Sequence, residues 1–239
     1  MFESIPNSPY VVWDPKGFEE ELSGLLAVST TKTYQERKLV YLQGEKSDAF
    51  FFIRKGRVKI SILKEDGSEK IIRIQEGNTF FGEYAAFDGH PHFASAIALE
   101  ESRISRIPVS SVESVIKAHP RVAFLIINRI IRKFRSLAFQ LEDLTFLDAQ
   151  TRIARMLVSL AAEVGEQGTQ GITIKKGITH EDLANLTGLS RVRVTTILNN
   201  FERADMIRKK RAVLTIIDPT KLRNLADGAG ALGQQLAEG

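Results

Sequence analysis

The spacing of apolar residues changes near Ser110, and this change divides the chain into a β-rich part and a helical part. Residues 33–108 are short β-type runs broken by turn residues, and residues 57–62 alternate polar and apolar side chains as a half-buried strand does. Asp66 and Gly67 separate that run from a β-branched run at 71–74, which predicts a hairpin. We therefore expect an all-β sandwich or jelly roll before the helical part.

A long helix is expected after His119 and Pro120, because apolar residues there recur at alternating steps of three and four. They are Ile127, Ile130, Phe134, Leu137, Leu141 and Leu144. Charged side chains flank this narrow stripe, which is typical of helices that dimerise. The pattern predicts a parallel two-helix dimer, and the alternative is a helix packed on its own domain.

The last ninety-one residues are expected to form a winged helix–turn–helix. Residues 151–164 predict an amphipathic helix, residues 165–171 a loop and residues 172–174 a strand. In residues 179–198, Thr179 and Ser190 are expected to cap two helices, and Gly188 suits a tight turn with positive φ. Residues 206–217 then predict two strands joined by a basic turn, which is the wing.

The excess of positive charge lies in the C-terminal part of the chain. The formal net charge is +4, and residues 149–239 hold 13 basic and 9 acidic side chains. A basic C-terminal part indicates an anionic partner such as double-stranded DNA, although a solvated basic face is the alternative. The expected DNA-contacting residues are Thr179, His180, Ser190, Arg191, Val192, Arg193, Thr195, Thr196, Lys209, Lys210 and Arg211.

Several classes of protein are disfavoured by what the sequence lacks. There is no cysteine, which excludes disulfides, thiolate metal sites and iron–sulfur clusters. No run of apolar residues is long enough for a membrane-spanning helix, and the N-terminus does not read as a secretory signal. No nucleophile–base motif, P-loop or zinc-protease motif is present, so we do not expect an enzyme. A ligand-binding module that merely shares the β-rich part is the alternative.

Four segments together resemble the Crp/Fnr family of transcription regulators. They are the hairpin at 65–69, the segment 81–91, the end of the long helix at 144–148 and the winged helix. The resemblance implies an α+β chain: a cyclic-nucleotide-binding-like β jelly roll in residues 1–118, a dimerisation helix and hinge in 119–148 and a DNA-binding domain in 149–227. It also implies a homodimer, a small-molecule effector, a two-fold operator and contact with RNA polymerase. Residues 228–239 are rich in Gly and Ala and are expected to be a disordered tail, and we expect a cytoplasmic location and no membrane partner.

The effector pocket departs from the cAMP-binding members of that family. Those members carry Arg and then Ser or Thr where this chain has His92 and Phe93, and a Thr–Ser pair where it has Leu137 and Ala138. Arginine supplies a permanent charge for phosphate, whereas phenylalanine supplies no donor. Only Gly82 and Glu83 of the nucleotide contacts are retained, so cAMP is disfavoured. The expected pocket residues are Gly82, Glu83, Tyr84, His92, Phe93, Leu137 and Ala138.

No resident cofactor or metal is expected. Haem is an alternative because His90, His92, His119 and His180 exist. Phenylalanines around the pocket are mostly core residues, but Phe93 in place of a phosphate ligand suits a hydrophobic or aromatic effector. The phenylalanine-rich sequence around the pocket resembles that of family members that govern anaerobic respiration, including those that sense halogenated phenols.

The second helix of the helix–turn–helix indicates which bases are read. Many family members carry Glu and Arg one and five positions after the residue that matches Arg191, and this chain has Val192 and Thr196 there. Glutamate accepts a hydrogen bond from cytosine, whereas valine contacts a thymine methyl group. We therefore expect a palindrome richer in A·T than the usual TGTGA half-site of the family, of a TTAA-like type.

Overall fold

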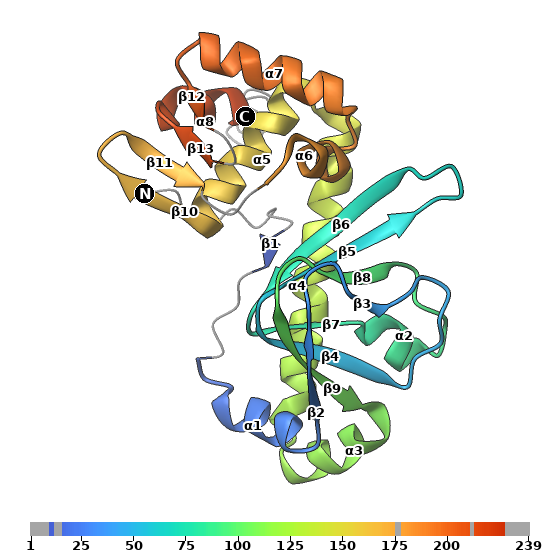
Figure 1. The fold of residues 1–239 in the computed structure, drawn as a ribbon. Helices are drawn as coiled ribbons and strands as arrows, with labels where there is room; N and C mark the ends of the chain where they lie inside the picture. Colours follow the sequence, from blue (N-terminus) through green and yellow to red (C-terminus); the bar gives the residue numbers. More distant parts are fainter. Residues whose placement is uncertain (1–9, 12–15, 175–177, 211–212, 228–239) are drawn as a thin grey trace, which may run out of the picture. The chain divides into compact units, whose positions relative to one another are not determined.

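A computed structural model describes residues 10–11, 16–174, 178–210 and 213–227. The predicted tail at 228–239 lies outside the described residues. The contacts within the chain divide it into two compact units, one formed by residues 9–134 and the other by the described residues from Arg135 onward. The boundary lies inside the helix α4 (Arg121–Phe146), which can be followed in Figure 1.

The first unit contains two β-sheets, as the sequence predicts. All strand pairs are antiparallel except β1 with β6. One sheet has the order β1 (Tyr10–Val11), β6 (Glu69–Glu76), β5 (Arg57–Leu63), β8 (Ser95–Ala98) and β3 (Leu39–Tyr41). The other has the order β2 (Thr30–Tyr34), β9 (Ser102–Pro108), β4 (Ala49–Lys55) and β7 (Thr79–Phe81).

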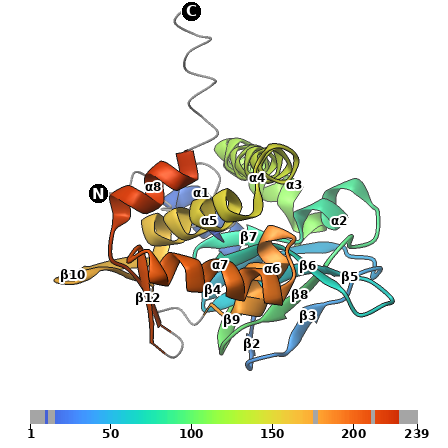
Figure 2. The same cartoon turned by 90° about the horizontal axis from the view of Figure 1, so that it is seen from above.

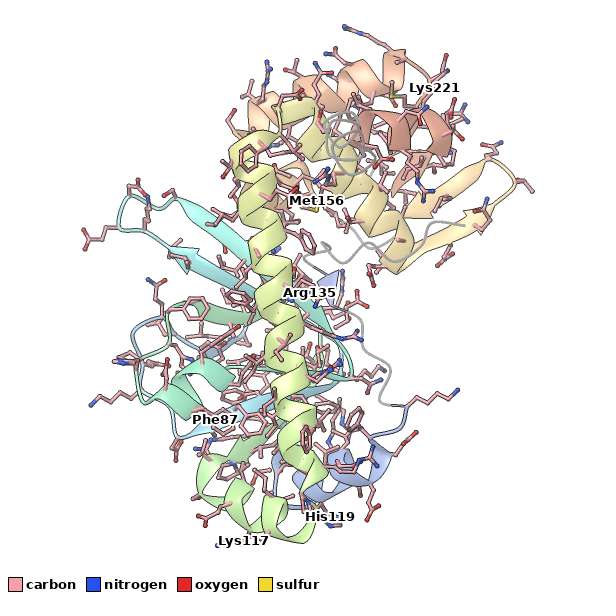
Figure 3. All side chains as sticks on the ribbon, turned by 180° about the vertical axis from the view of Figure 1, so that it is seen from behind. Phe87, Lys117, His119, Arg135, Met156 and Lys221 are labelled. Atoms are coloured by element: carbon pink, nitrogen blue, oxygen red, sulfur yellow. The ribbon has the colours of Figure 1, made fainter. Side chains whose placement is uncertain are left out.

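The apolar run of β4 is continuous because both faces of this strand are buried. Phe50 and Phe52 belong to a core that includes residues of α1 (Glu19–Ala27), α3 (Val109–Ala118) and α4. Phe51 and Ile53 point to the opposite face and belong to a second core with residues of both sheets. At the end of α3, the Nδ1 atom of His119, labelled in Figure 3, lies 3.3 Å from a carboxylate oxygen of Glu20.

The predicted hairpin joins β5 to β6. Its loop is held by a hydrogen bond of 3.0 Å from the Lys64 N–H to the Ser68 carbonyl, and Gly67 has a φ of 82°. A positive φ of this kind is accessible to glycine at little cost. The D-G pair therefore predicts both the place of the turn and its backbone conformation.

The second unit packs helices on a four-stranded sheet of order β10–β11–β13–β12. In Figure 2, α8 lies beside α5, and the two helices are in contact. The elements are α5 (Ala149–Val164), β10 (Gly165–Gly168), β11 (Gly171–Ile174), α6 (His180–Thr187), α7 (Arg191–Arg203), β12 (Ile207–Lys210), β13 (Val213–Ile216) and α8 (Pro219–Asp227). Helix α7 contacts β12 of this sheet, and α5 contacts both α6 and α7.

The predicted loop at 165–171 is wrong, because most of it is strand β10, which pairs with β11. Glycine-rich composition gave no strand signal, since these strands are held by their backbone pairing. Gly171 has a φ of 119°, and a Cβ atom there would lie 2.0 Å from the Ile216 carbonyl oxygen of the neighbouring strand. The glycine thus permits a close strand approach rather than a flexible loop.

Candidate functional site

The helix–turn–helix is built by the caps that the sequence predicts. The Thr179 hydroxyl accepts a hydrogen bond of 3.0 Å from the Asp182 N–H, and the Asp182 carboxylate accepts one of 3.0 Å from the Thr179 N–H. This reciprocal pair is a capping box at the start of α6. Gly188 ends α6 with a φ of 69°, and the Ser190 hydroxyl accepts a bond of 3.2 Å from the Arg193 N–H at the start of α7.

One face of α7 is buried and the other is exposed at its N-terminal end. The buried face consists of Val194, Ile197, Leu198 and Phe201. Arg191, Val192, Arg193 and Thr196 are exposed. Val192 is 77% exposed, so this β-branched side chain has no packing role in the chain. The first turn of α7 thus presents two guanidinium groups and a methyl surface, which are groups that contact base edges and phosphates.

His180 joins α6 to α7 through Thr195. The His180 Nδ1 atom lies 2.9 Å from the Thr195 hydroxyl, which itself donates to the Arg191 carbonyl at 2.9 Å. A hydroxyl has one proton, so His180 Nδ1 is the donor in this pair. Burial lowers the pKa of His180, and the positive charges of Lys209 and Arg191 lower it further. His180 and Thr195 therefore hold the two helices together through a neutral imidazole.

The wing presents fewer basic groups than its sequence suggests. The Lys209 ammonium lies 3.2 Å from the Glu202 carboxylate and donates to the Asn199 side chain at 2.5 Å. Because both partners belong to α7, Lys209 braces the wing against the helix. Lys210 is exposed. Arg211 lies outside the described residues.

The segment predicted to bind the effector begins at the short helix α2 (Glu83–Asp88). Gly82 precedes it with a φ of 76°, and a Cβ atom there would lie 3.0 Å from the Phe51 ring. Glu83 is buried, and its Oε1 atom accepts a hydrogen bond of 2.5 Å from the Lys133 ammonium of α4. The same ammonium donates to the Phe80 carbonyl at 2.7 Å. One oxygen of this carboxylate, Oε1, is therefore already paired within the chain, whereas Oε2 is buried without a hydrogen-bond partner.

His92 and Phe93, the next two predicted pocket residues, differ in burial. The His92 ring stacks on Tyr41, with ring centroids 3.6 Å apart, and burial lowers the pKa of His92. Its backbone N–H is also engaged, because it donates to the Glu45 carbonyl. Phe93 is 46% exposed and meets the ring of Tyr84 edge-on at 5.5 Å. The imidazole is neutral and buried, and Phe93 with Tyr84 forms an aromatic surface.

Sequence reasoning missed three buried basic side chains of the first unit. Arg73, Arg129 and Lys133 are 3%, 7% and 5% exposed. The Arg73 Nη2 atom donates to the Lys133 carbonyl at 3.0 Å. A signal existed at Arg73, which interrupts a run of isoleucines on β6. No comparable sequence signal marks Lys133, because a lysine beside a helical apolar stripe is usually solvated.

The exposed apolar stripe of α4 differs in part from the predicted one. Ile127, Phe134 and Leu141 are 51%, 70% and 66% exposed, and Leu144 is 41% exposed. Ile130 and Leu137 are half-buried, whereas Ala138 is exposed. The exposed positions with three- and four-residue spacing are Phe124, Ile127, Ile131, Phe134, Ala138 and Leu141. The expected and the observed stripes share Ile127, Phe134 and Leu141. Between these positions, Ile130 and Leu137 were expected, whereas Ile131 and Ala138 are exposed.

No cluster of three or more metal-ligating side chains occurs among the described residues. His92, His119 and His180, three of the four histidines considered for haem, already contact Tyr41, Glu20 and Thr195. Nor does any helix in the described part of the chain have the length and apolarity needed to cross a membrane.

Comparisons with known proteins agree with this architecture. A family model for the cyclic nucleotide-binding domain matches residues 31–119, and one for the Crp-like helix–turn–helix domain matches residues 151–225. The CRP-like cAMP-activated global transcriptional regulator of Mycobacterium tuberculosis is 30% identical over 187 residues, which cover 78% of this chain and 84% of the relative. The global nitrogen regulator of Synechocystis is 25% identical over 84% of this chain and 90% of its own length.

A solved structure shows the same fold over most of the chain. A mutant of CooA from Carboxydothermus hydrogenoformans has a TM-score of 0.75 at 22% identity, and the match covers 85% of this chain and 90% of that one. The two relatives named above are regulators, and the mycobacterial one is a transcriptional regulator. With a nucleotide-binding-type β-domain followed by a Crp-like helix–turn–helix, the chain belongs to the Crp/Fnr family of DNA-binding transcription regulators.

Proposed function

We propose that this regulator binds a palindromic operator as a homodimer, and that a small molecule in the β-domain controls its affinity for DNA. The observation that carries the proposal is the exposed first turn of α7, where Arg191, Val192 and Arg193 have no packing role and follow a capped N-terminus. In a helix–turn–helix, this end of the second helix enters the major groove.

The residues of α7 suggest how the operator is read. Arg191 is proposed as the main base contact, because an arginine can donate two bonds to guanine, and Arg193 as a phosphate or second base contact. Val192, which is 77% exposed, suits a thymine methyl group. The half-sites are therefore expected to be richer in A·T than TGTGA. Lys210 and Arg211 of the wing are proposed to contact the backbone, whereas Lys209 supports the wing.

Dimerisation is proposed to occur through the exposed stripe of α4. Phe124, Ile127, Ile131, Phe134 and Leu141 are each at least half exposed. An apolar stripe of this length on a regular helix is rarely left in water, and heptad spacing lets a second copy of the same helix cover it. Two DNA-binding units related by a two-fold axis would then match a palindrome whose half-sites are about one helical turn apart.

The effector is proposed to be a molecule other than cAMP. Glu83 is already paired with Lys133, His92 is neutral and stacked, and Phe93 supplies no donor for a phosphate group. RNA polymerase is proposed as the second macromolecular partner, and the cytoplasm as the location in which both partners are found. No catalytic step is proposed, because the family relatives are regulators.

The proposal is tested by selecting an operator from random double-stranded DNA and measuring its affinity by fluorescence anisotropy. Arg191→Ala should weaken binding about tenfold or more, because losing a bidentate arginine–guanine pair costs about 1–3 kcal/mol. Arg103→Ala, an exposed arginine on β9, is the matched control and should bind as the unsubstituted protein does. Equal affinities for the unsubstituted protein and Arg191→Ala would contradict the assignment of α7.

A further inference from the structure

A pocket of about 320 Å³ lies inside the second unit, which is formed by the described residues from Arg135 onward. Its wall comes from α5, β11, α6, α7, β12 and β13, which can be followed in Figure 1. Arg191, Val192 and Arg193, the exposed residues proposed to read DNA, do not line it. An aliphatic cavity of about 150 Å³ can bind benzene. The pocket therefore has room for a molecule roughly twice the size of benzene.

The wall of the pocket is mostly apolar. Its most buried part consists of leucines that are between 0% and 2% exposed, namely Leu157 and Leu160 of α5, Leu183 of α6 and Leu198 of α7. Val213 and Leu214 of β13 also line the pocket and are half-buried. Water finds few hydrogen-bond partners against such a wall, whereas an apolar molecule gains free energy by leaving bulk water for it. Walls of this kind are typical of small-molecule sites.

Two polar side chains of the wall are already paired within the chain. The Thr179 hydroxyl donates to the Asp182 carboxylate at 2.7 Å and accepts from the Asp182 N–H. The Lys209 ammonium lies 3.2 Å from the Glu202 carboxylate and also donates to the Asn199 side chain. The positive charge at the wall is therefore compensated by a carboxylate of α7. A neutral ligand suits this wall better than an anion does.

His180 supplies a hydrogen-bond acceptor to the wall. Its Nδ1 atom donates to the Thr195 hydroxyl, so the Nε2 atom of the neutral ring is an acceptor. No residue in the described part of the chain donates to Nε2. Burial and the positive charges of Lys209 and Arg191 lower the pKa of His180, so the ring is neutral near pH 7. A ligand that carries a hydrogen-bond donor would satisfy this nitrogen.

We propose that the pocket binds a neutral, apolar molecule about twice the size of benzene that carries one hydroxyl or N–H group. The apolar body packs against the leucines of α5, α6 and α7, and the donor group bonds to His180 Nε2. A carboxylate is disfavoured because Nε2 is an acceptor and Lys209 is already paired with Glu202. The site uses no residue of the β-domain, so it is separate from the effector site proposed above.

The wall of the pocket includes the elements that hold the proposed DNA-reading surface. His180 joins α6 to Thr195 of α7, and Lys209 joins β12 to Glu202 of the same helix. A ligand in contact with both His180 and Lys209 would change how the wing and α6 are held against α7. We therefore expect binding to change the affinity for the operator without involving α4. This regulatory consequence rests on the proposed function, whereas the binding of the ligand does not.

The first experiment measures the melting temperature of the purified full chain without DNA. The probes are 2-naphthol, 2-methoxynaphthalene and 2-naphthoate, which share one ring system and are used at the same concentration. We expect 2-naphthol to raise the melting temperature by several degrees, because a ligand that binds only the folded state stabilises it. The methoxy compound lacks the donor and the naphthoate is charged, so both should raise it less. Equal shifts for the three probes, or no shift with 2-naphthol, would overturn the proposal.

The second experiment locates the binding. Val213→Phe places a larger apolar side chain in the pocket and should weaken the binding of 2-naphthol at least about tenfold by calorimetry. Leu214→Phe is a second variant of the same kind, and circular dichroism verifies that each variant is folded. Val164→Phe is the matched control, because Val164 is a half-buried valine of α5 that does not line the pocket. Unchanged binding of 2-naphthol to a folded Val213→Phe or Leu214→Phe chain would overturn the site.

A third variant tests the acceptor. His180→Phe removes Nε2 and keeps an aromatic ring at the wall, so 2-naphthol and 2-methoxynaphthalene should bind this variant with equal affinity. A preference for 2-naphthol that persists in His180→Phe would overturn the role of Nε2.

A final measurement separates the ligand site from its regulatory use. Operator binding is measured with and without 2-naphthol for the unsubstituted protein and for Val213→Phe. We expect 2-naphthol to change the affinity of the unsubstituted protein for DNA and to have no effect on Val213→Phe. An equal effect on both proteins would place the probe elsewhere and overturn the site. A chain that binds 2-naphthol in the pocket but selects no operator would contradict the proposed function and leave the ligand site supported.

Discussion

Truncating Phe134 tests whether α4 forms the dimer interface. Phe134 and Leu141 lie seven residues apart on the exposed stripe and are 70% and 66% exposed. Leu137, which the sequence also places on the stripe, is half-buried in its own chain, so a change there would alter folding as well as association. Phe134→Ala removes interface area with little effect on the isolated protomer.

The expected loss follows from these exposures. Burying a side chain of this size is worth roughly 1.5–3 kcal/mol, so covering the exposed part of Phe134 contributes about 1–2 kcal/mol per protomer. A two-fold interface contains the residue twice, which gives about 2–4 kcal/mol per dimer. Because each 1.4 kcal/mol is a factor of ten, Phe134→Ala should raise the dimer dissociation constant roughly 30- to 1,000-fold. Adding Leu141→Ala should leave a monomer at micromolar concentration.

Sedimentation equilibrium over a dilution series measures this constant, and circular dichroism verifies that each variant is folded. Leu63→Ala is the control, because Leu63 is 55% exposed at the end of β5 and lies outside α4. It should leave the dissociation constant unchanged. A change of less than threefold for Phe134→Ala, or an equal change for Leu63→Ala, would refute dimerisation through the stripe.

Three further predictions concern DNA and pH. Lys210→Ala should weaken binding to all sequences alike and lower the salt slope by about one unit, unlike Arg191→Ala, and anisotropy titrations at several salt concentrations distinguish the two. Val192→Glu should shift preference toward G·C at one position per half-site in a selection from random DNA, and an unchanged preference would mean that residue 192 does not face the bases. Burial lowers the pKa of His92 in the folded chain below its value of about 6.5 in the unfolded chain. Neutral His92 therefore makes its full contribution to the free energy of unfolding above about pH 6.5, and this contribution is lost as the pH falls below that value. Urea unfolding between pH 7 and 5 should show this loss, and His92→Phe should reduce it.

Features fixed by neighbouring residues could be predicted from the sequence. The caps at Thr179 and Ser190, the turn at Gly188 and the hairpin turn at Gly67 all occur where they were expected. Each depends on hydrogen bonds or backbone angles within about four residues. The hairpin of β10 and β11 was missed because its glycines respond to distant partners, such as the Ile216 carbonyl beside Gly171.

Long-range contacts could not be predicted in the same way. Nothing near Lys133 in the sequence indicates that its ammonium meets Glu83, fifty residues away. The stripe on α4 was ambiguous for a related reason: isoleucine stands at both 130 and 131, and only packing against the β-domain decides which one is covered. The spacing of apolar residues predicts that α4 has an apolar stripe. Which residues of the stripe are exposed can be known only from the tertiary structure.

The proposed effector control and the proposed dimer interface involve consecutive residues of one helix. Lys133 points toward the β-domain and is 5% exposed, whereas Phe134 points away from it and is 70% exposed. Neighbouring residues of an α-helix are about 100° apart around its axis, so a rotation or shift of α4 that moves one side chain moves the other. An effector in the β-domain that altered the Lys133–Glu83 contact and a second subunit that covered Phe134 would therefore act on the same helix. By linkage, the factor by which the ligand changes the dimer constant must equal the factor by which dimerisation changes the affinity for the ligand.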